Sequence, residues 1–155
     1  MVVYIVLEGV LAKTLTGSEF PQKISDLKLG WKAFEWLKTV PDLTDIVVLS
    51  NQTWIYGGPG IRSGEKFWSK LKYVSECLRE ELELAGKSPK ITDYVAIKKP
   101  WIHGLQTPGP NLVQSAWSRN PNLIGQESIF VCRPIDFDVM FAKSMGFTNI
   151  KTDLC

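Results

Sequence analysis

The chain has 155 residues, of which 45% are hydrophobic, with 18 basic and 16 acidic side chains and a formal net charge of +2. This length and hydrophobic content predict a single globular domain over residues 1–155, with one core and no separate linker. The net charge is too small to imply a general nucleic-acid-binding surface on its own, so any basic site must be local. The three cysteines are unevenly spaced and form no CxxC pair, which favours reduced thiols over a disulfide framework or a zinc site.

The N-terminal run is apolar but too short to cross a membrane. Glu8 interrupts it well before the ~20 residues that a membrane span needs, and no basic segment precedes it. We therefore expect a buried strand at Val2–Leu7, a cytoplasmic location and no membrane partner.

Short apolar runs alternate with helical patterns along the rest of the chain. In chain order we expect a strand at Val2–Leu7, a helix at Gly30–Val40, a strand at Ile46–Leu49, a helix from about Glu65 to Ala85 ended by Gly86, a strand at Tyr94–Ile97, a helix from Pro110 through Trp117, a strand at Ile129–Val131, a helix at Asp136–Met145 closed by Gly146, and an edge strand within residues 148–152. This alternation predicts an α/β fold, a doubly wound, Rossmann-like parallel sheet with helices on both faces and the first strand in the centre.

Ligands of such sheets bind outside the carboxyl ends of the strands, so the residues that follow each strand are the candidates for a site. Ser50 and Asn51 follow the second expected strand, and Lys99 follows the third. A hydroxyl, free backbone amides and an ammonium group together favour an anion, which predicts a phosphate-binding site. Lys99 is preferred to Lys98 because it directly precedes Pro100.

Three segments after these strands, SNQTWIYGG, KKPWIHGL and FDVMFAKSMGF, have a recognisable order. They resemble the second, third and fourth motifs of the haloacid dehalogenase (HAD) superfamily of phosphohydrolases, closest to its histidinol-phosphate, heptose-bisphosphate and polynucleotide phosphatase group. The third motif is one residue longer here than in the family. The resemblance implies a HAD-type sheet, and the short segment before Gly30 leaves little room for a cap domain. Each motif alone is weakly specific, and three in the right order are more so.

The first motif of the superfamily, Asp-x-Asp-Gly-Thr-Leu, supplies the nucleophile, the general acid and base, and ligands for Mg²⁺. Aligned with this chain, it places Val6 at the nucleophile position and Glu8 at the second acid. A valine side chain can neither attack phosphorus nor hold a metal. Arg133 stands near the usual Gly-Asp of the fourth motif, leaving Asp138 as its distal acid. The resemblance thus implies that Glu8 and Asp138 are vestigial catalytic residues, with no metal and no cofactor.

Two tryptophans fall in the loops after the second and third expected strands, whereas Trp31, Trp36, Trp68 and Trp117 lie in helical patterns typical of core packing. Trp54 and Trp101, with Arg133, are expected at the rim of the site, where an aromatic ring can stack on a base or contact a protein.

Three hypotheses of function follow. The first is a degenerate phosphatase-like domain, a pseudoenzyme that binds a phosphorylated small molecule, a nucleic-acid end or a protein. The second is an active phosphomonoesterase with an unusual nucleophile, which would require Mg²⁺. The third is a purely structural or interaction protein, with a homodimer as one form.

Overall fold

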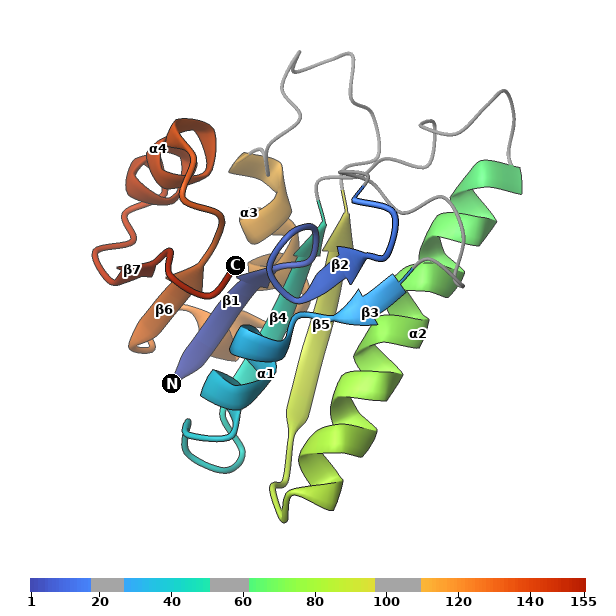
Figure 1. Ribbon diagram of the computed structural model, residues 1–155. Helices are drawn as coiled ribbons and strands as arrows, with labels where there is room; N and C mark the ends of the chain where they lie inside the picture. Colours follow the sequence, from blue (N-terminus) through green and yellow to red (C-terminus); the bar gives the residue numbers. More distant parts are fainter. Residues whose placement is uncertain (18–26, 51–61, 97–109) are drawn as a thin grey trace.

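The computed structural model describes residues 1–17, 27–50, 62–96 and 110–155 (Figure 1). Its elements in chain order are β1 (Val2–Val6), β2 (Ala12–Thr14), β3 (Leu27–Leu29), α1 (Trp31–Leu37), β4 (Asp45–Ser50), α2 (Arg62–Leu84), β5 (Lys90–Ala96), α3 (Pro110–Arg119), the 3₁₀ turn η3 (Pro121–Leu123), β6 (Ser128–Val131), α4 (Asp136–Ser144) and β7 (Ile150–Lys151). No helix among these residues is both long and apolar enough to span a membrane.

Five strands form one sheet in the order β5-β4-β1-β6-β7, and every pairing in it is parallel. The predicted α/β class and the central position of the first strand are confirmed. Each residue of β1 and β4 is buried, which explains why both strands are nearly continuous apolar runs.

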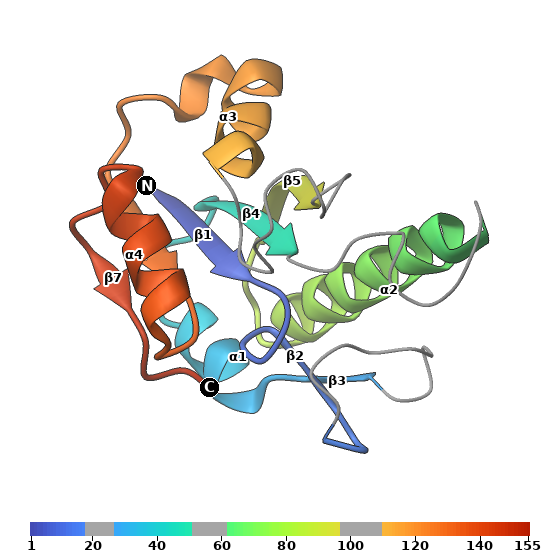
Figure 2. The ribbon, with the colours of Figure 1, turned by 90° about the horizontal axis from the view of Figure 1, so that it is seen from above.

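Helices cover the sheet from two sides, as the view from above in Figure 2 shows. The helix α3 lies on one side of β1, β4 and β5, and α1 and α2 lie on the other. One apolar face of α2 enters the core through Val74, Leu78 and Leu82, which are spaced by four residues. A ring from α3 also reaches the central strand, where the Trp117 Nε1–H donates a hydrogen bond of 2.8 Å to the buried Tyr4 hydroxyl. Burial raises the pKa of this phenol, and the hydrogen bond from Trp117 partly offsets the increase.

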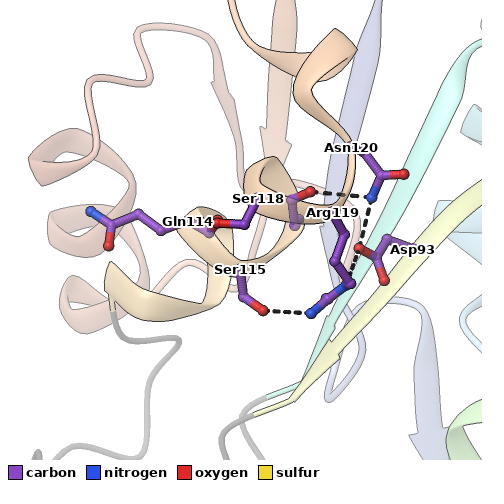
Figure 3. Close-up of polar contacts among 7 residues, drawn as sticks. Asp93, Gln114, Ser115, Ser118, Arg119 and Asn120 are labelled. Atoms are coloured by element: carbon purple, nitrogen blue, oxygen red, sulfur yellow. Dashed lines mark hydrogen bonds and ion pairs between the residues drawn. The ribbon is translucent and has the colours of Figure 1, made fainter.

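The end of α3 is attached to β5 by a small polar cluster (Figure 3). Asp93 of β5 accepts hydrogen bonds of 2.9 Å from Arg119 Nε and from the Asn120 amide. Arg119 also donates to the Ser115 hydroxyl at 2.7 Å, one helical turn earlier. The cluster joins two elements that are distant in sequence and holds α3 against this side of the sheet.

Three expectations differ from the structure. The third main strand begins at Lys90, four residues before the predicted Tyr94, and its predicted last residue, Ile97, lies outside the described residues. A small antiparallel pair, β2 with β3, was not predicted, because three-residue strands carry too little alternation to be recognised. Trp31 was expected in the core but is 66% exposed, since it begins a helix of only seven residues.

Gly30 brings the start of α1 into direct contact with the loop that follows β1. Its amide donates a hydrogen bond of 2.7 Å to the Leu11 carbonyl. A Cβ atom at Gly30 would lie 1.8 Å from the Val10 carbonyl oxygen, a separation that no side chain tolerates. The absence of a side chain at this position therefore allows α1 to support the loop after the central strand.

We predict that Gly30→Ala lowers the free energy of unfolding by about 3 kcal/mol or more, because backbone atoms must move to admit the methyl group. Gly125→Ala is the matched control: Gly125 has φ +82° but no atom within 4 Å of the added Cβ. It should cost only about 1–2 kcal/mol of backbone strain. Urea unfolding followed by tryptophan fluorescence measures both, and equal losses would contradict the close contact at Gly30.

Candidate functional site

The carboxyl ends of β1, β4 and β6 meet at one edge of the sheet. Val6 pairs with Leu49 of β4, and Ile5 pairs with Val131 of β6. Parallel pairing in this register brings the residues that follow the three strands to the same edge. The strand order reverses at β1, which is where open α/β sheets bind ligands.

Two polar side chains from neighbouring strands meet at this edge. The Ser50 hydroxyl, at the end of β4, donates a short hydrogen bond to Glu8 Oε1, in the loop after β1. Ser50 is fully buried and Glu8 is 2% exposed. The hydroxyl expected to donate to phosphate therefore faces a carboxylate of the same chain, and an anion there must overcome the charge of Glu8.

A buried ion pair lies in the segment after β6. Arg133 donates to both carboxylate oxygens of Asp138, from Nε to Oδ2 at 2.9 Å and from Nη2 to Oδ1 at 3.0 Å, and its backbone amide also donates to Oδ2 at 3.2 Å. Asp138 is completely buried and the Arg133 side chain is 13% exposed. This bidentate geometry is the strongest arrangement of an arginine–carboxylate ion pair.

Gly9 links this ion pair to the loop that carries Glu8. It has φ +78°, and a Cβ atom there would lie 3.1 Å from Cδ of Arg133. The aliphatic part of the arginine side chain thus lies over the glycine backbone. Four residues assigned to the site from sequence, Glu8, Ser50, Arg133 and Asp138, form two contacts at one end of the sheet.

Val6 occupies the last position of β1 and is fully buried. Its carbonyl accepts a hydrogen bond of 3.2 Å from the Leu11 amide, and the Leu7 carbonyl accepts one of 2.8 Å from Ala12. The loop after β1 therefore folds back on the strand end, and two backbone hydrogen bonds hold it there.

Other predicted site residues lie outside the described residues. They are Asn51 and Lys99 of the expected phosphate site, and Trp54 and Trp101 of the expected rim. Their assignment continues to depend on the sequence.

The described part of the site does not suit Mg²⁺. The Val6 side chain has no atom that can bind a metal, and both oxygens of Asp138 accept hydrogen bonds from a guanidinium group. A cation at that carboxylate would have to displace Arg133 and would be repelled by it. Within the described ranges, no three His, Cys, Asp or Glu side chains lie close enough to share a metal ion.

Cys132 lies between β6 and Arg133 and is fully buried. Burial, followed by the nearby Asp138 carboxylate, raises the pKa of its thiol to about 12. All three cysteines are free thiols, as predicted. Since the thiol of Cys132 stays neutral at ordinary pH, it is a packing group and not a nucleophile.

Comparisons with protein-family models, with curated proteins and with solved structures give no significant match.

Sequence reasoning missed the contacts between these side chains. Glu8 and Ser50 are 42 residues apart, and no local pattern signals that one donates to the other. The Arg133–Asp138 pair spans only five residues across a turn and the first turn of α4. The acidic residues at the start of α4 were the one sequence signal for the position of Asp138, because carboxylates are favoured at helix N-termini.

We predict that Arg133→Met lowers the free energy of unfolding by about 3 kcal/mol, because it leaves the Asp138 carboxylate buried without its cation. The double variant Arg133→Met/Asp138→Asn should lose less than the sum of the single losses. Arg119→Met, which removes a half-exposed partner of Asp93, should cost no more than about 1 kcal/mol. Additive losses in this cycle would contradict a buried, mutually dependent pair.

The raised pKa of the Cys132 thiol predicts that the free energy of unfolding depends on pH. The thiol has a higher pKa in the folded chain, about 12, than its ordinary value of 9.0. Its contribution is thus fully present below pH 9 and is lost as the pH rises towards 12, by at most about 1.4 kcal/mol per pH unit. Cys132→Ala should flatten the fall of unfolding free energy between pH 9 and 11 relative to the wild type. Val131→Ala, a truncation without an ionisable group, should retain the wild-type slope; equal slopes in all three proteins would refute the assignment.

Proposed function

We propose that the chain is a catalytically degenerate phosphatase-like domain of the HAD type, which binds a phosphorylated ligand at the carboxyl edge of its sheet. The proposal is supported first by Val6, which is fully buried at the end of the central strand, where the resemblance implies the nucleophilic aspartate. The parallel sheet with β1 in the centre is the arrangement that a doubly wound fold of this kind requires.

Loss of phosphoryl transfer follows from the chemistry of the residues present. The reaction needs a carboxylate in line with phosphorus and a divalent cation to neutralise the phosphate oxygens. Val6 cannot provide the first, and the Arg133–Asp138 ion pair opposes the second.

Anion binding depends on a cation beyond the described part of the site. Glu8, Asp138 and Arg133 carry a formal net charge of −1, and the guanidinium is already shared with Asp138. Lys99, three residues beyond the end of β5, would supply the missing positive charge, together with the Ser50 hydroxyl and the Asn51 amide. Trp54 and Trp101 would then contact the part of the ligand that carries the phosphate, whether nucleotide, nucleic-acid end or peptide.

The Ser50–Glu8 hydrogen bond favours a second candidate, a structural or interaction protein. In that case the polar groups at the strand ends only satisfy one another, and the vestigial pocket binds nothing. An active phosphohydrolase that uses Glu8 is less well supported, because this carboxylate is 2% exposed and accepts a hydrogen bond from a neighbouring strand.

Titration with inorganic phosphate and with a 3′-phosphorylated oligonucleotide tests the proposal by calorimetry. Lys99→Ala should weaken binding by roughly 1–3 kcal/mol, the scale of a hydrogen bond to a charged group. Glu8→Gln should strengthen it, because the negative charge beside Ser50 is removed. Lys98→Ala is the matched control and should bind like the wild type. Absence of binding by the wild type would favour the structural candidate, and unchanged affinity in Lys99→Ala would contradict the proposed site.

A further inference from the structure

Residues of β3, α1 and α2, whose ribbons are labelled in Figure 1, line a groove of about 390 Å³. Its lining residues are Leu27, Lys28, Leu29, Trp31, Phe34, Tyr73, Val74, Cys77, Glu80 and Glu81. None of them belongs to the phosphate site proposed above. The volume is within the usual range for small-molecule sites, about 300–1,000 Å³.

The groove combines an apolar base with an aromatic rim. Phe34 and Val74 are buried, whereas Trp31 and Tyr73 are 66% and 44% exposed. The rings of Trp31 and Phe34 are in contact, with centroids 5.2 Å apart. The exposed indole of Trp31 packs against Phe34 and offers a π face. Among aromatic side chains, tryptophan is the best partner for an organic cation.

Two carboxylates give the groove its charge. Among the lining residues, Glu80 and Glu81 of α2 oppose the ammonium of Lys28, which gives the lining a formal net charge of −1. No ion pair found in the described part of the chain includes either glutamate. At the same wall, the neighbouring Cys77 raises the pKa of the Tyr73 phenol. The phenol therefore stays neutral and adds no negative charge of its own.

We propose that this groove binds a small organic cation with an apolar body, such as an aryl- or alkylammonium ion. The apolar part would lie over Phe34 and Val74, and the ammonium group would face Trp31 and the two glutamates. A small anion is disfavoured because it would meet two carboxylates and one lysine. This inference is independent of the proposed phosphate site.

The probe for the test is 4-phenylbutylammonium, and its control is 4-phenylbutyrate, which has a similar apolar body and the opposite charge. Calorimetry should detect the ammonium ion and not the carboxylate, with affinity falling as salt is added. A second measurement uses Cys77 as a reporter. The bound probe should slow its alkylation by N-ethylmaleimide, while Cys155, outside the groove and also partly exposed, reacts at an unchanged rate.

Variants of α2 test the role of charge. Glu80→Gln/Glu81→Gln should weaken ammonium binding by about five- to tenfold, the sum of two exposed charge interactions. Glu83→Gln, on the same helix but outside the groove, should leave affinity unchanged. Absence of ammonium binding, equal binding of both probes, or unchanged affinity in the double variant would overturn the proposal.

Discussion

The burial of β1 between β4 and β6 is the constraint on which the rest of the structure depends. A central parallel strand needs apolar residues on both faces. The side chains of Val2–Val6 meet that need, and all five residues are buried. The same position makes the end of β1 the point where the strand order reverses. Glu8, Ser50 and Arg133 are neighbours at one edge because the three strands that carry them are adjacent and parallel.

At that edge, buried polar groups are matched within the chain. Ser50 donates to Glu8, and Arg133 uses two nitrogens of its side chain on Asp138. A buried charge without a partner would cost several kcal/mol, so such pairs persist once they form. The arginine beside Asp138 removes the demand for a metal ion there and also opposes one. Under the proposed function, these pairs would keep the strand ends stable with valine at the position of the nucleophile.

Most of the fold was predictable because it depends on local patterns. Unbroken apolar runs indicated β1 and β4, and apolar spacing indicated α2 up to its end near Gly86. The hairpin of β2 and β3 was missed because its strands are three residues long, and Trp31 was placed in the core because spacing alone cannot show that a short helix has one open side. At the site, sequence placed Glu8, Ser50 and Arg133 after strand ends and Asp138 at the start of the following helix. It could not show that they pair with each other, since side-chain partners are set by packing across the sheet.

Phosphate release is the most direct test of the proposed loss of catalysis. It should be measured on an aryl phosphate and on a 3′-phosphorylated oligonucleotide, with and without Mg²⁺. If the chain is degenerate, the wild type should give no turnover above buffer. Val6→Asp should give almost none, because Arg133 still opposes a metal ion. Turnover should appear only in a variant that also replaces Arg133 by an acid. Robust Mg²⁺-dependent turnover by the wild type that Glu8→Gln abolishes would contradict the loss of catalysis and identify Glu8 as the nucleophile.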